Sequence, residues 1–319
     1  MQDFFWGHKK RYNDFPTFFR KNFSERVQKV SIDAGFTCPN RDGTKGKGGC
    51  SYCNNLTFNP SYCNLKTGVT SQIEKGIDFF GKKYDTMKFL AYFQAYTNTY
   101  APLEDLKRLY EEALQHPKIM GLVISTRPDT ISEELLEYLA ELSKKTYVMV
   151  ELGLESHLDR SLERINRGHT FAESKWALHQ TSIRGINNCA HLILGLPGET
   201  RTDWLKQAKI ISQLPVNNLK LHQLQIQKGT VMETQFQKNP EQFHQFSIEE
   251  YIELVVDYLE LLNPAIVVER FVSQSPPEML LAPKWGLKNF EFAAKVEKRL
   301  RERNTWQGRL FDCDYTILL

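Results

Sequence analysis

Short apolar segments alternate with amphipathic segments along most of the chain. The apolar segments predict seven strands, at residues 27–33, 87–93, 119–125, 147–154, 189–195, 219–224 and 266–269. Helical periodicity lies between them, at residues 70–84, 102–116, 132–144, 157–165, 170–184, 199–213 and 247–262, and a basic helix follows at about 287–303. Strands and helices of these lengths in alternation predict βαβ units and a parallel sheet. Because eight strands close a (β/α)₈ barrel, seven predict an α/β fold with a partial or irregular TIM-like barrel.

The chemistry of such a fold gathers at the carboxyl ends of its parallel strands. The long loop at residues 36–68 follows the first predicted strand, at such an end, and carries four of the six cysteines. We expect residues 25–272 to form the barrel domain, with this loop included. Residues 1–24 would then be a basic and aromatic amino-terminal extension, and residues 273–319 a basic carboxyl-terminal extension packed on the barrel.

The composition excludes several classes of protein. With 319 residues, 41% hydrophobic and 25% charged, the chain is neither disordered nor collagen-like nor a coiled coil. No apolar run approaches the roughly 18 residues of a membrane span, and no apolar segment follows the basic residues near the amino terminus as in a secretory signal. The sequence therefore predicts a cytoplasmic protein without a membrane partner, whose cysteines stay reduced.

The net charge of +3 is unevenly distributed. Residues 1–30 carry seven Lys/Arg against three Asp/Glu, and residues 284–309 carry eight against three, which leaves −6 for the remainder. Basic residues interleaved with aromatic ones suit RNA, because charges contact phosphates and rings stack under bases. The expected phosphate contacts are Lys9, Lys10, Arg11, Arg299, Arg301 and Arg303. The alternative is a pair of solvated helix faces whose aromatic residues pack the two ends onto the barrel.

Three cysteines of the long loop are spaced for one metal centre. Cys50 and Cys53 form a C-x₂-C pair, and Cys38 precedes them at a C-x₁₁-C spacing across a glycine-rich segment that can turn tightly. Three thiolates on a four-iron cluster would leave one iron open to another ligand. Cys63 could instead complete a four-cysteine zinc site. A thioredoxin-type redox pair and unligated core cysteines are further alternatives.

The segment Cys-Pro-Asn-Arg-Asp-Gly-Thr-x-Gly-x-Gly-Gly-Cys-x-Tyr-Cys, residues 38–53, resembles the signature of radical S-adenosylmethionine (radical SAM) enzymes of the YhcC/YtqA (MnmL-like) type. Its long first gap also resembles that of the elongator-type tRNA-modifying subunit. Four further segments agree in order: Ser-Thr-Arg-Pro-Asp at 125–129, Glu-Leu-Gly-Leu-Glu-Ser at 151–156, Ile-Asn-Arg-Gly-His at 165–169 and Leu-Ile-Leu-Gly-Leu-Pro-Gly-Glu at 192–199. The resemblance implies that Cys38, Cys50 and Cys53 hold a [4Fe-4S] cluster and that SAM binds its open iron. It leaves Cys63 outside the cluster, while Cys189 and Cys313 are isolated, which argues against a second one.

The resemblance also implies which residues contact SAM. Glu155 would accept hydrogen bonds from the ribose hydroxyls, and Arg167 would pair with a carboxylate, although a helix-end salt bridge is the alternative for Arg167. The usual Gly-Gly-Glu motif after the second strand is not evident, and His191 stands where the related coproporphyrinogen-oxidase-like branch has Asp. The further candidates are Gln94, Thr97 or Asn98 for the SAM amino group, Tyr52, Gly195 and Pro197 near the adenine, and His191.

Members of this type are associated with the wobble uridine of tRNA. The implied step converts 5-carboxymethylaminomethyluridine to 5-aminomethyluridine, with an electron donor such as flavodoxin or ferredoxin and a downstream tRNA methyltransferase as partners. Candidates for substrate contact, each with a surface or barrel-rim salt bridge as the alternative, are His222, Gln223, Gln225, Lys228, Glu269 and Arg270. Two other functions compete with this one: radical SAM chemistry on a small molecule or peptide, and a zinc-stabilised RNA-binding protein without catalysis.

Overall fold

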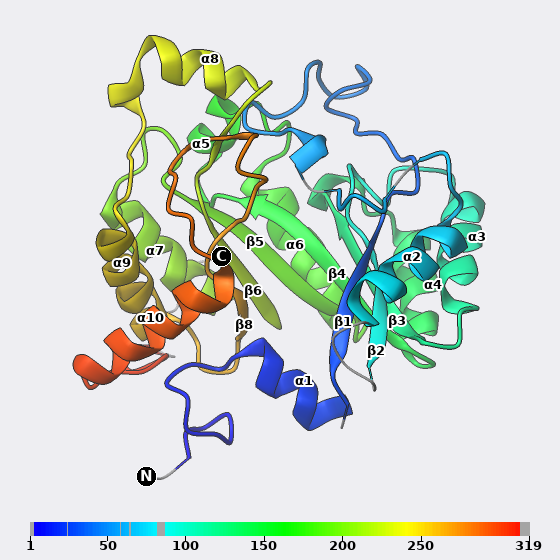
Figure 1. Cartoon of the computed structure of the whole chain (residues 1–319), viewed down its shortest axis with the longest axis horizontal. Helices are drawn as coiled ribbons and strands as arrows, with labels where there is room; N and C mark the ends of the chain where they lie inside the picture. Colours follow the sequence, from blue (N-terminus) through cyan, green and yellow to red (C-terminus); the bar gives the residue numbers. More distant parts are fainter. Residues whose placement is uncertain (1–2, 24, 58, 64, 82–86, 313–319) are drawn as a thin grey trace.

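The computed structural model describes residues 3–23, 25–57, 59–63, 65–81 and 87–312. Its centre is a sheet of seven parallel strands in chain order, with β1 and β8 at the two edges. The sheet curls into a half-barrel (Figure 1). The strands are β1 (Val27–Ile32), β2 (Lys88–Phe93), β3 (Ile119–Thr126), β4 (Tyr147–Glu155), β5 (Asn187–Leu194), β6 (Asn218–Gln223) and β8 (Val267–Arg270). The predicted strands and the predicted partial barrel are confirmed.

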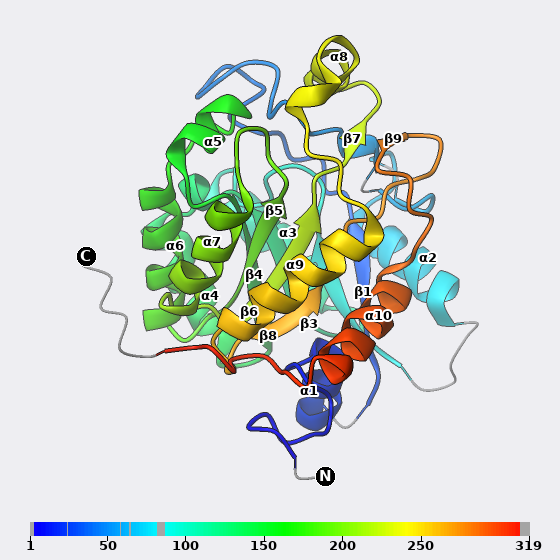
Figure 2. The ribbon, with the colours of Figure 1, turned by 90° about the vertical axis from the view of Figure 1, so that its left-hand side faces the viewer.

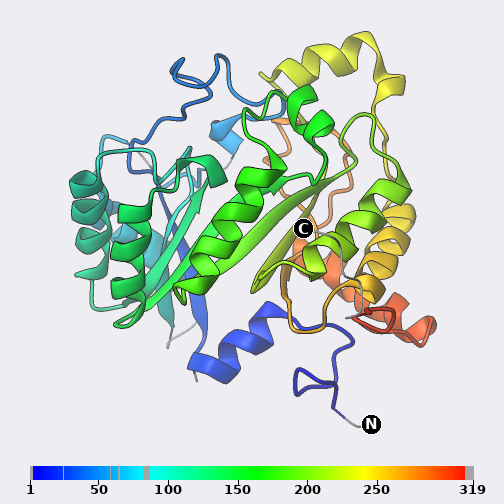
Figure 3. The ribbon, with the colours of Figure 1, turned by 180° about the vertical axis from the view of Figure 1, so that it is seen from behind.

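Helices cover the outer face of the sheet (Figures 1 and 3). They are α2 (Val69–Gly81), α3 (Leu103–Leu114), α4 (Glu133–Ser143), α6 (Phe171–Ile183), α7 (Arg201–Ser212) and α9 (Ile248–Leu261). The short α5 (Asp159–Arg164) lies instead at the end of the barrel that carries the cysteine loop (Figures 1 and 2). Side chains cap several of them: Ser132 accepts from the backbone of α4, and Thr170 and Thr200 close capping boxes on α6 and α7. The predicted helices are thereby confirmed, although residues 82–84 of the first lie outside the described residues. None of the helices described is both long and apolar enough to cross a lipid bilayer.

Some elements were not predicted. They are α1 (Phe15–Phe23), α8 (Val231–Lys238) and an antiparallel pair of short strands, β7 (Ile226–Gln227) and β9 (Leu280–Ala282). Two or three residues are too few for periodicity to reveal a strand. The sequence does carry a start signal for α8, namely a threonine three residues before a glutamate. In the structure Thr230 is the N-cap, and its hydroxyl accepts from the backbone N–H of Glu233.

The two terminal extensions pack together on the edge strand β8. The predicted basic helix is α10 (Asn289–Glu302), which lies along α9 (Figure 2). Asn13 joins three parts of the chain: its N–H donates to Gln307 Oε1 at 2.9 Å, and its carbonyl accepts from the N–H of Val268 at 2.7 Å. Arg11 Nη1 donates to the carbonyl of Thr305 at 3.1 Å. Residues before β1 and after α10 therefore form one packed layer with β8.

Helix α1 fills the amino-terminal end of the half-barrel. It lies across the strand ends and contacts both edges, β1 and β8 (Figure 1). Phe19 is buried there against the inward-facing side chains of Leu90, Met149 and Cys189. Tyr12 and the four phenylalanines of α1 thus pack on the barrel, as one of the two alternatives proposed, whereas Phe5 is exposed.

Four ionised side chains form a closed network inside the half-barrel. Nζ of Lys29, on β1, lies 2.6 Å from Oε1 of Glu151, on β4, and 2.6 Å from Oε1 of Glu269, on β8. Nζ of Lys220, on β6, lies 2.6 Å from the same oxygen of Glu151 and 3.1 Å from the same oxygen of Glu269. The hydroxyl of Tyr92 donates to the second oxygen of Glu151 at 2.7 Å. Two cations balance two anions, so that each buried charge has partners that offset its loss of water.

We expect Glu151→Gln to lower the free energy of unfolding by about 3–5 kcal/mol, because it leaves two buried ammonium groups short of a counter-charge. Burial by itself would raise the pKa of Glu151, but Lys220 and Lys29 outweigh burial and hold it well below its ordinary value of 4.5. A carboxylate with a depressed pKa contributes stability above its unfolded-state pKa, and this contribution is lost as pH falls through the folded-state pKa. The stability difference between wild type and variant, measured by urea unfolding, should be constant near neutrality and shrink below pH 4.5.

The matched control is Glu134→Gln on the exposed face of α4, which should change stability by less than about 0.5 kcal/mol. A Glu151→Gln protein as stable as this control would show that the network does not hold the fold.

Candidate active site

A cavity of about 380 Å³ opens at the carboxyl ends of the strands. Its walls come from the cysteine loop, from the ends of β2 to β6 and β8, and from residues 273–274. The loop crosses the mouth of the barrel. Ser51 N–H donates to the carbonyl of Ile165 at 2.9 Å, and Ser51 carbonyl accepts from Met232 N–H at 2.8 Å. This is the end of the sheet at which the sequence predicts the chemistry.

The three predicted cluster ligands line this cavity together. Cys38, Cys50 and Cys53 are all free thiols; the first two are buried and the third is half-buried. The loop that returns Cys38 to the pair is tight, because a Cβ at Gly46 would lie 2.2 Å from Oδ1 of Asn40. Glycine is therefore required at this turn.

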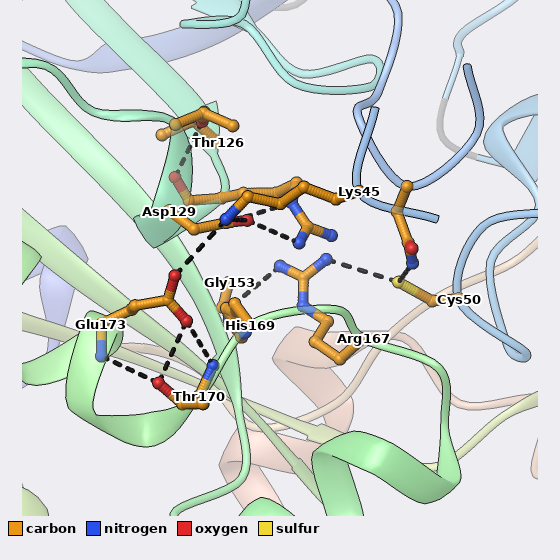
Figure 4. Close-up of polar contacts among 12 residues, drawn as sticks. Lys45, Cys50, Thr126, Asp129, Gly153, Arg167, His169, Thr170 and Glu173 are labelled. Atoms are coloured by element: carbon orange, nitrogen blue, oxygen red, sulfur yellow. Dashed lines mark hydrogen bonds and ion pairs between the residues drawn. The ribbon is translucent and has the colours of Figure 1, made fainter. Parts of the chain in front are cut away.

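Nitrogen donors surround the sulfur atoms. Cys50 Sγ accepts from Asn40 Nδ2 at 3.7 Å and from Arg167 Nη1 at 3.4 Å (Figure 4). Cys53 Sγ accepts from Asn55 Nδ2 at 3.6 Å. Burial, with the neighbouring Cys50, raises the pKa of Cys53 to about 11. A metal centre would replace the protons, and hydrogen bonds to its thiolates would then be favourable, so these residues fit a cluster with three cysteine ligands.

The other cysteines lie elsewhere. Cys63 is not among the residues that line the cavity, and its thiol donates to the carbonyl of Ser31 at 3.1 Å. Cys189 is buried on β5, where potential ligand atoms of Glu151, Cys189 and His191 lie within 4.8 Å of one another. Glu151 is already paired with Lys29 and Lys220, so we assign it to the ionic network and not to a metal site. Cys313 lies outside the described residues.

Arg167 links the cysteine loop to β4. Besides Cys50, its guanidinium donates from Nη2 to the carbonyl of Gly153 at 2.7 Å and lies 3.4 Å from Glu155 Oε1 (Figure 4). A Cβ at Gly153 would lie 2.6 Å from Nη2, so only glycine admits this approach. Glu155 has a φ of +66°, at a register shift between β4 and β5. Such strain in a residue other than glycine is typical of functional sites.

Arg127 lines the cavity. It stands in the Ser-Thr-Arg-Pro-Asp segment at 125–129, but it is not among the residues predicted to bind a ligand. Its Nε and Nη2 each donate to Asp129 at 2.9 Å, and Lys45 Nζ lies 2.8 Å from the same carboxylate (Figure 4). Burial by itself would raise the pKa of Asp129, but Arg127 and Lys45 hold it at about 2. Nη1 of Arg127 is buried without a partner among the described residues, which leaves one donor for a ligand in the cavity.

The residues predicted to bind SAM fall into two sets. Those that line the cavity are Tyr52, Gln94, Thr97, Glu155, Arg167 and His191. Asn98, Gly195 and Pro197 are not among the lining residues. Asn98 Nδ2 donates to the carbonyl of Ser125 at 2.8 Å and joins the ends of β2 and β3. Gly195, with a φ of +95°, forms the turn after β5, where a Cβ would lie 2.7 Å from the ring of Phe246.

The substrate candidates also separate. His222, Gln223, Gln225 and Arg270 line the cavity, whereas Lys228 is exposed and Glu269 belongs to the ionic network. Gln223 and Gln225 donate from Nε2 to the carbonyl of Ser273 at 3.2 and 3.1 Å, and hold the segment after β8 against the cavity. Further lining residues that had no signal of their own in the sequence are Arg41, Asn55, Ser273 and Gln274.

The two basic ends meet, but on the side of the barrel away from the cysteine loop (Figure 1). The N–H of Arg11 donates to Glu297 Oε2 of α10 at 3.0 Å. The predicted phosphate contacts are mostly paired within the chain: Lys10 with Asp14, Arg299 with Glu253, Arg301 with Glu297, and Arg303 with Glu253, Asp257 and Glu260, while Arg11 donates to Asn304 and Lys9 is exposed. Contact of these residues with RNA stays a prediction.

Known proteins are similar to this chain in sequence. Residues 38–209 match the model of the Radical SAM superfamily, and residues 216–302 match that of a Radical_SAM C-terminal domain. YtqA of Bacillus subtilis (strain 168) is 36% identical over 303 residues, which cover 95% of this chain and 94% of that protein. YhcC of Escherichia coli (strain K12) is 32% identical over 295 residues, which cover 92% and 94%. The tRNA uridine(34) acetyltransferase of Methanocaldococcus infernus is 25% identical over 204 residues, 63% of this chain and 36% of that protein.

A solved structure shows the same architecture. The archaeal Elp3 of Methanocaldococcus infernus aligns with a TM-score of 0.64 at 19% identity, over 89% of this chain and 64% of that one. The match of the superfamily model covers more than half of this chain, and the match to YtqA covers nearly all of it. The chain belongs to the radical SAM superfamily, in the family of YtqA and YhcC.

Proposed function

We propose that the chain is a radical SAM enzyme that modifies the wobble uridine of tRNA, converting 5-carboxymethylaminomethyluridine to 5-aminomethyluridine. The observation that carries the proposal is the convergence of Cys38, Cys50 and Cys53 on one cavity at the carboxyl ends of the strands. Superfamily membership implies a [4Fe-4S] cluster and SAM as cofactors. Cys63 bonds to the backbone of β1, which favours three cysteine ligands over a four-cysteine zinc site.

The cluster, when bound, supplies the electron that cleaves SAM to methionine and a 5′-deoxyadenosyl radical. The residues of this chain bind and orient the reactants. Arg167 and the free donor of Arg127 suit the SAM carboxylate, and Glu155 suits its ribose hydroxyls. Tyr52 would lie near the adenine, and Gln94 and Thr97 near the amino group. We expect Asn98, Gly195 and Pro197 to act through the shape of the loops.

The tRNA part of the proposal rests on relatives and on charge. One relative is named a tRNA uridine(34) acetyltransferase. The segments that carry the six basic residues predicted to contact phosphate, residues 9–11 and the end of α10, lie on the side of the barrel away from the cysteine loop (Figure 1). In the proposed scheme, a substrate that contacts both these residues and the cavity spans the barrel, which an RNA can do and a metabolite cannot. An electron donor such as flavodoxin or ferredoxin and a downstream tRNA methyltransferase complete the proposed scheme.

We expect Cys53→Ala to abolish iron binding, because it removes one of three thiolate ligands. Anaerobically purified wild type should be brown and hold about four iron atoms per chain, whereas the variant should hold almost none. The matched control is Cys63→Ser, which keeps a donor for the Ser31 carbonyl and should retain iron. Colourless wild-type protein with one zinc would contradict the cluster.

The reaction can be tested on tRNA nucleosides. A strain without this gene should accumulate 5-carboxymethylaminomethyluridine, because the carboxymethyl group is no longer removed. Mass spectrometry should show aminomethyl products restored by wild type and by Cys63→Ser, but not by Cys53→Ala. An unchanged nucleoside profile in the deletion strain would contradict the tRNA reaction and direct the search to a small molecule or a peptide.

We propose the carboxymethyl CH₂ as the source of the abstracted hydrogen. The carbon radical would then give up one electron and one proton to form an imine, with the electron returned to the cluster. Water would hydrolyse the imine to release glyoxylate and leave the aminomethyl group. A tRNA deuterated at that CH₂ should therefore give 5′-deoxyadenosine that carries deuterium, detected by mass spectrometry. Deuterium placed on the ribose of the same nucleotide should not be transferred. Unlabelled 5′-deoxyadenosine from the CH₂-labelled tRNA would exclude this site of abstraction.

A further inference from the structure

Arg270 is a cation of the cavity wall that does not belong to the ionic network. Lys29 and Lys220 are balanced by Glu151 and Glu269. Arg270 also lines the cavity, and its guanidinium has no ion pair or hydrogen bond within the described part of the chain. The wall beside β8 is therefore positively charged.

A local irregularity of β8 directs this side chain. Leu219 of β6 pairs with Val268, but the next residue, Lys220, pairs with Arg270, so that Glu269 is the extra residue of a bulge. In a regular strand, neighbouring side chains point to opposite faces. Here Glu269 contacts the lysines inside the barrel and Arg270 lines the cavity above them. Bulges re-aim side chains in this way next to active sites.

His222 supplies a second polar group at the same place. It lies on β6 two residues beyond Lys220, the register partner of Arg270, and lines the cavity. Its Nε2 is buried and has no hydrogen-bond partner among the described residues. Burial, with His191 and Arg270, lowers the pKa of His222 well below its ordinary value, so the imidazole is neutral and can donate one hydrogen bond.

No free carboxylate of the described chain competes for this corner. Glu155 is the one acidic residue among those that line the cavity, and it is paired with Arg167 beside Cys50. A guanidinium binds a carboxylate through two parallel hydrogen bonds, and the neutral imidazole of His222 adds a further donor, so the two side chains together suit an anion.

We propose that Arg270 and His222 bind the carboxylate of the substrate, at a subsite separate from the one that binds SAM. This inference rests on the proposed function. It gives the enzyme a way to distinguish its substrate from its product, since 5-carboxymethylaminomethyluridine carries the carboxylate and 5-aminomethyluridine does not. A site built to pair with a charged group rejects a ligand that lacks it, because the site's own groups are then left unpaired.

The test uses cluster-loaded enzyme and two anticodon stem-loop RNAs that differ only in a carboxymethylaminomethyl or an aminomethyl group on the wobble uridine. Anaerobic fluorescence anisotropy should show tighter binding of the first RNA to wild type. Arg270→Gln should reduce this preference by about 10- to 100-fold, and Arg270→Lys should retain part of it. Arg108→Gln on α3, which removes an exposed arginine paired only with Asp105, should leave the preference unchanged.

SAM affinity, measured by equilibrium dialysis, identifies the source of the carboxylate. It should be the same in Arg270→Gln as in wild type. If SAM binding falls while the RNA preference persists, Arg270 serves the carboxylate of SAM and the subsite is wrongly assigned. If neither changes, Arg270 binds no carboxylate. A wild type that does not distinguish the two RNAs would also overturn the subsite, whereas the nucleoside profile of the deletion strain decides the proposed function independently.

Discussion

The ion pair between Lys29 and Glu269 spans the open seam of the half-barrel, and the arrangement of the site depends on it. A closed barrel joins its last strand to its first by a ladder of backbone hydrogen bonds. In this chain β1 and β8 are the sheet edges, and side chains 2.6 Å apart connect them. Below that contact α1 fills the barrel with aromatic rings. Above it the seam holds the cavity. The network therefore closes the cavity on the side of α1. By joining β1 to β8, it also sets the cysteine loop, which follows β1, opposite the segment that follows β8.

The same network determines which charges the cavity offers to a ligand. Its lysines are neutralised, and burial lowers the pKa of His191, which stays neutral beside Glu151. The other cations among the described lining residues are arginines, namely Arg41, Arg127, Arg167 and Arg270. Arg127 follows β3, and Arg167 contacts both Cys50 and the end of β4, whereas Arg270 is the last residue of β8. In the proposed function, this separation allows two carboxylates, one from SAM and one from the substrate, to bind in a single cavity without exchanging places.

Much of this fold could be predicted because each strand is a short apolar run and each crossover carries its own helical period. The approach of Cys38 to the Cys50–Cys53 pair could also be predicted, from spacing and glycine content. Other features depend on contacts distant in sequence. The direction of Arg270 follows from a bulge that no local pattern marks. Asn98 and Gly195 stand in or beside motifs, yet they support loops and do not line the cavity. Arg299 and Arg303 are basic residues of a helix in the sequence, but the fold sets the acids of α9 beside them.

The position of Asn13 has a consequence for how the protein is made. Its backbone bonds to β8 and to Gln307, so residues from both ends of the chain meet at one edge of the sheet. A ribosome makes Asn13 some 250 to 300 residues before it makes Val268 and Gln307. Until β8 and Gln307 emerge, the nascent chain has a curled sheet with an unpaired edge at β6. Its ionic network also lacks the contacts that Glu269 makes with the two lysines. Such edges recruit other strands. The barrel is thus completed only after residue 307 has emerged, and products cut short before α10 are the forms that a cell's chaperones and proteases would meet.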